Sequence, residues 1–157
     1  MTQVEVETLI RVDEDFAPLS AMPARPAGEG ELPVIEGGIR LVVDGVSVLT
    51  PDLWDDVDSL WAYIIDGVAD AVDGKPFRGG FPDQDIPIEV DPLDRGRLRF
   101  AVGRVGDDHH AEAVVEARPF AHAIAEGGDA FWRQVEARYP SYGTSWVRGR
   151  IARLRAA

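Results

Sequence analysis

The chain of 157 residues contains no cysteine. This absence excludes disulfide bonds, zinc sites with thiolate ligands, iron–sulfur clusters and thiol chemistry, and it agrees with a reducing compartment. No apolar run approaches the roughly 18–20 residues that a membrane span needs. The first residues also lack the basic and apolar regions of a signal peptide. We therefore expect a cytoplasmic protein.

Positive charge is scarce as well. The sequence has 16 Lys and Arg against 28 Asp and Glu, which gives a formal net charge of −12. A surface of that sign repels the phosphates of nucleic acids and anionic membranes, so we expect neither as a partner. It attracts a basic protein, but an acidic surface is also a common means of staying soluble. Composition leaves both interpretations open.

The first fifty residues predict β-structure around one irregular segment. Apolar and polar residues alternate over residues 3–12, which is typical of a strand with one buried face. Asp44-Gly45 separates two apolar runs, 39–43 and 46–49, and predicts a hairpin with a type I′ turn. Residues 15–33 contain four Pro, and we interpret them as a Pro/Gly-rich internal loop.

The rest of the chain predicts helices and further strands. Thr50-Pro51 and an i, i+3, i+4 apolar pattern predict a long helix over residues 51–73. Three alternating runs follow at 86–90, 98–102 and 111–116, and Pro87 either places the first of them at an edge or limits its hydrogen-bonded ladder. Helical patterns return from Arg118 and from Ser145. In the first of these two, the pair Gly127-Gly128 predicts either a break or the close approach of another backbone.

No βαβ repeat appears in this order, so nothing demands a parallel sheet. We predict an α+β fold in a single domain, residues 1–157, of a size that can bury its own core. Its mainly antiparallel sheet has about five to six strands in hairpins and a meander, and two to three helices pack against one face.

The predicted helix over residues 51–73 carries only negative charge. It has seven aspartates and no Lys or Arg. Those near its start suit the positive end of the helix dipole, whereas Asp66, Asp70 and Asp73 stand at the unfavourable end. Two explanations stay open for these three. Either the arginines of the last fourteen residues neutralise them within the molecule, or an external basic partner does.

Two loops contain other candidate groups. Phe81, Asp83 and Gln84 belong to a Gly-rich segment, residues 79–85, which predicts either a recognition loop or a turn held by a buried Phe81. Residues 107–112 hold His and acidic side chains, but too few share a face for a complete metal site, and we interpret them as a polar hairpin tip. No nucleophile elbow, phosphate loop or cofactor motif is present. We therefore expect no catalytic residues, no metal and no cofactor.

The leading hypothesis is a non-enzymatic, acidic protein-binding module that engages a basic partner. The residues predicted to bind the partner are Asp58, Asp66, Asp70, Asp73, Phe81, Asp83 and Gln84. The overall plan (small, acidic, free of Cys, α+β) is similar to that of many bacterial immunity proteins, which implies binding to a toxin or an adaptor role. The alternative is a small enzyme or ligand-binding protein with its site between residues 79–85 and 107–112. A third possibility is a structural subunit whose partner is a second copy, so both a monomer and a homodimer stay open. Either the apolar Trp146 or the edge of the N-terminal strand offers the contact for a homodimer.

Overall fold

A computed structural model describes residues 2–23 and 34–157, and within them it shows two antiparallel sheets and three helices. The strands are β1 (Val4–Val12), β2 (Asp15–Pro18), β3 (Glu36–Val43), β4 (Val46–Leu49), β5 (Asp55–Asp56), β6 (Phe77–Gly80), β7 (Pro87–Leu93), β8 (Arg97–Val102) and β9 (Ala111–Glu116). The α-helices are α1 (Val57–Val72), α2 (Ala117–Arg138) and α3 (Ser145–Arg155), and short 3-10 turns cover Leu19–Ala21 and Asp94–Gly96. The predicted α+β class is confirmed.

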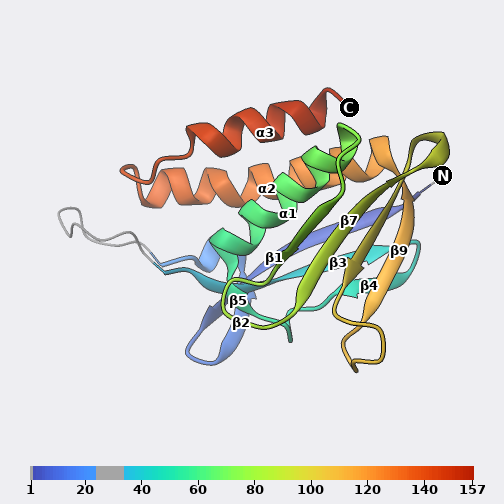
Figure 1. The fold of residues 1–157 in the computed structure, drawn as a ribbon. Coiled ribbons are helices and arrows are strands. Elements are labelled where there is room, and N and C mark those ends of the chain that lie inside the picture. Colours follow the sequence, from blue (N-terminus) through green and yellow to red (C-terminus); the bar gives the residue numbers. More distant parts are fainter. Residues whose placement is uncertain (1, 24–33) are drawn as a thin grey trace.

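The strands form a five-stranded and a four-stranded sheet in place of the single smaller sheet that we predicted. The first sheet has the order β2-β1-β3-β4, with β5 paired to β3, and the second has the order β6-β7-β8-β9. Strand β4 lies beside β9, so the two sheets meet along those strands. The helices lie together on one side of the strands (Figure 1). None of the helices in the described part of the chain combines the length and hydropathy of a membrane span.

The hairpin at Asp44-Gly45 is confirmed. Its strands β3 and β4 pair antiparallel, and both turn residues have positive φ angles, 48° and 82°. Type I′ geometry needs both. The strand predicted at the N-terminus is β1, which lies between β2 and β3. Part of the predicted loop over residues 15–33 is ordered as β2 and a 3-10 turn, while residues 24–33 lie outside the described residues.

The long helix begins at Val57, so its predicted start at residue 51 is wrong. Asp55 and Asp56 form β5 and pair with the first residues of β3. The amide of Val57 donates to the carbonyl oxygen of Ile35 at 2.8 Å. Pairing with a neighbouring strand therefore replaces the first helical turn that the capping pattern favoured, and residues 50–54 form a turn-containing connection that leads into β5.

Two glycines let α2 run unbroken against its neighbours. A Cβ on Gly127 would lie 2.7 Å from Val6 Cγ1, and one on Gly128 would lie 2.8 Å from Ile65 Cδ1. The helix therefore does not break, and the close approach comes from side chains of β1 and α1, where a backbone was predicted. Trp61 joins the same layers, because its Nε1 donates to Thr8 Oγ1 of β1 at 3.0 Å.

Strand β6, which covers Phe77–Gly80, was not predicted from the sequence. It pairs with β7, so β7 is an inner strand, and of the two alternatives that Pro87 left open the edge position is wrong. Pro87 is the first residue of β7, where its missing N–H removes no bond from the middle of the ladder. The β6–β7 connection, residues 81–86, returns beside β5 and brings Asp83 to the segment that precedes α1.

Candidate functional site

The strongest candidate site is a surface cavity of about 340 Å³ in front of the N-terminus of α1. Three segments that are distant in sequence line it: the start of β3, the loop from β4 into α1, and the β6–β7 connection. The lining residues are Glu36, Asp52, Trp54, Asp55, Asp56, Asp83 and Gln84. We call this the acidic cavity, because five of its seven residues are carboxylates.

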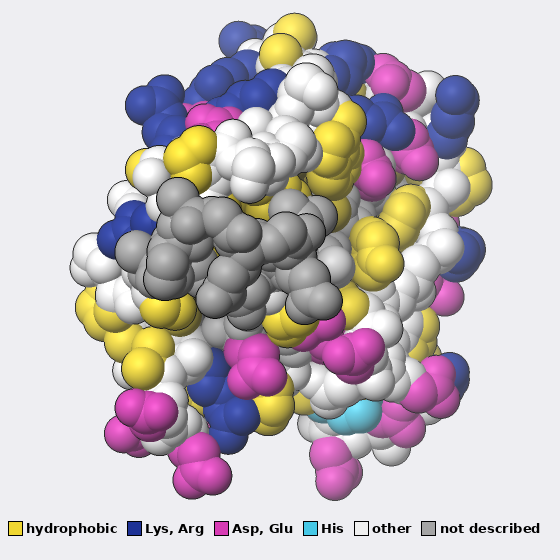
Figure 2. Space-filling model, turned by 90° about the vertical axis from the view of Figure 1, so that its left-hand side faces the viewer, with side chains coloured by type: hydrophobic (Ala, Val, Ile, Leu, Met, Phe, Trp, Pro, Cys, Tyr) yellow, Lys and Arg dark blue, Asp and Glu magenta, His cyan; other side chains and the backbone are white. Residues whose placement is uncertain are grey.

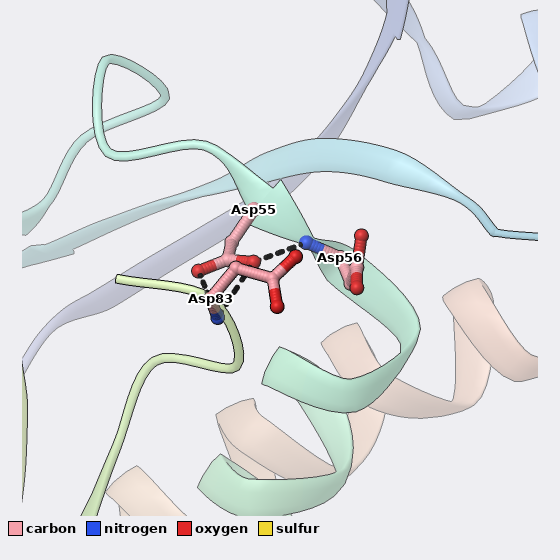
Figure 3. Close-up of side chains that lie close together, drawn as sticks. All are labelled: Asp55, Asp56 and Asp83. Carbon is pink, nitrogen blue, oxygen red and sulfur yellow. Dashed lines mark hydrogen bonds between the residues drawn. The ribbon is translucent and has the colours of Figure 1, made fainter. Parts of the chain in front are cut away.

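Asp55 is the structural centre of the acidic cavity. It is buried, and its carboxylate accepts the backbone N–H of Asp56 at 2.7 Å and that of Asp83 at 3.0 Å (Figure 3). These bonds tie the β6–β7 connection to β5. Gln84 adds a second tie, since its Nε2 donates to the carbonyl oxygen of Trp54 at 2.6 Å. The two loops are therefore held against each other, so the carboxylates come together in the folded state.

The carboxylates of Asp55, Asp56 and Asp83 lie within 4.8 Å of one another. Figure 3 shows the three side chains on β5, at the start of α1 and on the β6–β7 connection. Burial raises the pKa of Asp56, and the negative charges of Asp83, Asp55 and Asp58 raise it further. The site therefore concentrates negative charge, and each nearby carboxylate makes ionisation of Asp56 less favourable.

No Arg or Lys of residues 2–23 or 34–157 forms an ion pair with Asp52, Asp55, Asp56 or Asp83. The cation at the edge of the cavity is Arg11. It lies 3.8 Å above the ring of Trp54 and 3.8 Å from a carboxylate oxygen of Glu36. A guanidinium thus already packs on the aromatic wall of the cavity, which shows the kind of group that this wall accommodates.

The carboxylates can accept charge-assisted hydrogen bonds from an ammonium or a guanidinium, or supply oxygen ligands to a divalent cation. Asp55, Asp56 and Asp83 offer one oxygen each. Three oxygens are about half or fewer of those around Ca²⁺, which takes roughly six to eight. They match the several N–H donors of one Arg side chain more fully.

The aspartates predicted at the unfavourable end of the helix are paired within the molecule. Arg150 Nε lies 3.0 Å from Asp66 and its Nη2 lies 3.4 Å from Asp70, while Arg153 Nε lies 2.9 Å from Asp73. Of the two explanations that the sequence left open, the internal one therefore accounts for these three carboxylates. We call Asp66, Asp70, Asp73, Arg150 and Arg153 the α1–α3 ion-pair row.

The other predicted binding residues divide between core and surface. Phe81 is buried in the hydrophobic core, so the turn held by a buried Phe81 is the alternative that the structure realises. Asp58 is also buried and accepts a hydrogen bond from the Tyr142 hydroxyl at 2.8 Å. Burial and that carboxylate raise the pKa of Tyr142. Asp83 and Gln84 are exposed and lie in the acidic cavity.

Residues 107–112 do not line the acidic cavity. His110 Nδ1 lies 3.2 Å from the carbonyl oxygen of Gly103, and Glu112 accepts a hydrogen bond from Arg99 at 2.6 Å. Arg104 links the two predicted loops through its 2.8 Å contact with Asp85. The side chains of residues 107–112 thus contact the β8–β9 connection and the neighbouring strand β8. They do not line the cavity that contains Asp83.

Sequence reasoning missed Asp52, Trp54, Asp55 and Asp56 as site residues because it placed them on a helix. There, Trp54 faced the core and the acids suited the helix dipole. The close spacing of the acidic residues was visible in the sequence. Strand β5, which turns them toward Asp83, forms only by pairing with β3, a distant part of the chain.

Comparison of the chain with protein-family models, curated proteins and solved structures finds no match.

Proposed function

We propose that this protein is a non-enzymatic binding module whose acidic cavity receives a basic side chain of a partner protein. The observation that carries the proposal is the unbalanced charge of the cavity. Asp55, Asp56 and Asp83 gather within 4.8 Å, whereas the aspartates of the α1–α3 ion-pair row each have an arginine. The likeness in size and charge to immunity proteins supports the same class of function, a protein that acts by binding.

The geometry favours an arginine or lysine on a protruding segment of the partner. The cavity has a volume of about 340 Å³, and its wall includes the aromatic ring of Trp54, on which the protein's own Arg11 already packs. Positive charge that enters it finds the Asp55 carboxylate already held by the backbone N–H groups of Asp56 and Asp83, so the two loops that carry the acids need little rearrangement on binding. The net charge of −12 would also raise the rate of encounter with a basic partner, and salt would lower it.

Capture from extracts of the organism that produces the protein tests the proposal. The bait is the wild-type protein or the triple variant Asp52→Asn, Asp56→Asn, Asp83→Asn, eluted with a salt gradient. The matched control is Asp66→Asn, Asp70→Asn, Asp73→Asn, which removes the same three charges elsewhere. We expect a basic protein that the wild type and the control retain, and whose affinity for the cavity variant falls about tenfold or more.

Equal losses in both variants would mean that net charge alone attracts the partner, and would contradict a role of the cavity. A loss confined to the control variant would place the interface on the α1–α3 ion-pair row. Circular dichroism of each variant shows whether its fold is intact. Mutation of the captured protein's arginines and lysines one at a time then identifies the side chain that enters the cavity.

The three gathered carboxylates also favour one competing function, a small-ligand or metal-dependent site. That function predicts saturable binding of Mg²⁺ or Ca²⁺ that the Asp56→Asn and Asp83→Asn substitutions abolish. Calorimetric titration of the purified protein measures it directly. Stoichiometric metal binding at the cavity, together with no basic partner in the capture experiment, would replace the protein-binding proposal with this one.

A further inference from the structure

Two of the most exposed aromatic side chains in the described chain lie on α1 and α3. Tyr63 is 41% exposed and Trp146 is 46% exposed. Trp146 is nevertheless held in position, because its ring packs edge-on against the buried Trp132, 6.1 Å between centroids. A large aromatic surface that is fixed and exposed is typical of the anchor residues of protein interfaces.

The two aromatic residues occupy corresponding places on neighbouring helices. Helices α1 and α3 run parallel, since Asp58 contacts Tyr142, Asp66 contacts Arg150 and Asp73 contacts Arg153. Tyr63 precedes Asp66 by three residues, and Trp146 precedes Arg150 by four. Residues at these spacings share one face of a helix. The aromatic side chains therefore lie about one turn before the Asp66–Arg150 pair, on the same outer face.

The charges of this face are arranged in two stripes of opposite sign. The α1 stripe is Asp66, Asp70 and Asp73, and the α3 stripe is Arg150 and Arg153. Their side chains remain between 33% and 39% exposed, so each can accept a second contact. Figure 2 shows Lys and Arg side chains gathered along the upper edge of the molecule, where α3 lies, with Asp and Glu side chains beside them and lower down.

An acidic stripe beside a parallel basic stripe is complementary to a second copy of itself. If a two-fold axis runs along the groove between the helices, α1 of one copy faces α3 of the other at the same height. Asp66 then meets Arg150 of the second copy, and Tyr63 meets its Trp146. An axis across the helices would bring like charges together, and electrostatic repulsion disfavours it.

We propose that the α1–α3 face is the interface of a two-fold homodimer, with Tyr63 and Trp146 at its apolar centre and the α1–α3 ion-pair row on its flank. The face is small. Helices of 16 and 11 residues are about 24 and 16 Å long and pack about 9 Å apart. Such a face provides less than the roughly 800 Å² per partner of a standard interface, so we expect a dissociation constant in the micromolar range.

Sedimentation velocity over about 1–500 µM protein tests this interface. The wild type should pass from monomer to dimer over that range. The double variant Tyr63→Ser, Trp146→Ser should weaken the dimer about tenfold or more, because it removes both aromatic anchors. The matched control Val114→Ser changes an exposed apolar residue of β9 and should leave the dimer unchanged.

Charge exchange tests the orientation. Asp66→Arg and Arg150→Asp each place like charges across the interface, so each variant alone should be monomeric. Mixed together they should form a heterodimer, because every arginine of one then faces an aspartate of the other. The cavity variant Asp52→Asn, Asp56→Asn, Asp83→Asn should still dimerise, which separates this interface from the proposed partner site.

A wild type that stays monomeric up to about 500 µM would overturn the proposal. So would a wild-type dimer that is unaffected by the aromatic substitutions, or a mixture of folded charge variants that stays monomeric. If a charge variant fails to fold, the aromatic variants, which keep every charge, decide the question alone. Circular dichroism establishes which variants are folded.

Discussion

Two groups of aspartates from one stretch of chain, residues 52–73, have opposite surroundings in the folded protein. In the α1–α3 ion-pair row, Asp66, Asp70 and Asp73 each contact an arginine of α3. In the acidic cavity, Asp55 and Asp56 face another carboxylate, Asp83, and burial together with these neighbouring charges raises the pKa of Asp56. Aspartates are thus paired with arginines in the ion-pair row and gathered beside other carboxylates in the acidic cavity. The residues that the fold brings next to each group determine this difference, so local sequence alone does not assign a role to either group.

The largest expected effect comes from loosening α3, which supplies the arginines of the paired group. Asp129 of α2 is buried and contacts Arg133, Arg148 and Arg155. Burial alone would raise its pKa, but hydrogen bonds from Arg148 and Arg155 outweigh burial and lower it. Asp129→Ala should lower the free energy of unfolding by about 2–3 kcal/mol, measured by urea denaturation at neutral pH.

The pH dependence of Asp129 follows from the same contacts. Its carboxyl has a lower pKa in the folded state than in the unfolded chain. Its contribution to stability is therefore complete above the unfolded pKa and is lost as the pH falls through the folded pKa. The difference in stability between wild type and Asp129→Ala should shrink in acid. A difference that stays constant from neutral pH to well below the pKa of an ordinary aspartate would contradict this account.

A smaller effect should follow when one arginine of the ion-pair row is removed. Arg150→Ala leaves Asp66 and Asp70 without their cation and so makes this region resemble the acidic cavity. Because the pairs are partly exposed, we expect a loss of about 0.5–1 kcal/mol that high salt reduces. Thermal unfolding at low and high salt measures it. The control is Arg97→Ala, an exposed arginine that contacts a backbone carbonyl and should show little change or salt dependence.

The smallest change in the free energy of unfolding is expected for a substitution of Asp56, and it should stabilise the protein where the other substitutions destabilise it. Its carboxyl has a raised pKa in the folded state, so the ionised form costs stability at neutral pH and that cost disappears as the pH falls through the folded pKa. Asp56→Asn should stabilise the free protein by a few tenths of a kcal/mol at pH 7 and not in acid. Urea denaturation at both pH values, with Asp108→Asn as an exposed control, checks this. Destabilisation at pH 7 would show that the cavity is not strained by its own charge.

The parts of the fold that were predictable are those that short segments of sequence determine. The Asp44-Gly45 turn needs only its own φ angles, and the apolar spacing of α1 is visible within the helix. Most of the strands in the second sheet also followed from alternation. The start of α1 was not predictable in this way, because β5 exists only through pairing with β3. Strand β6 was hidden by its two glycines, which usually mark turns.

The candidate site was predictable only in part for the same reason. Asp83 and Gln84 were identified from their loop, and the arginines of α3 were identified as one possible answer to the aspartates of α1. The acidic cavity joins three segments. The contacts between the β4–α1 connection and the β6–β7 connection span 28 to 30 residues of chain, and the bonds of Asp55 to Asp83 depend on the whole of α1 and β6 being in place. The many aspartates predicted an acidic surface that binds a basic partner. Which aspartates come together could be seen only in the folded structure.

The ion-pair row also bears on the order in which the chain folds. Its contacts join residues 80 to 84 positions apart, such as Asp70 and Arg150, so a long loop must close before they form. The β3–β4 hairpin and the β7–β8–β9 meander need only short loops and are expected to form sooner. The carboxylates of α1 would then remain solvated during the early part of folding, and the ion pairs with α3 that stabilise the helix would form last. Substitutions in the row should accordingly speed unfolding and leave the folding rate nearly unchanged.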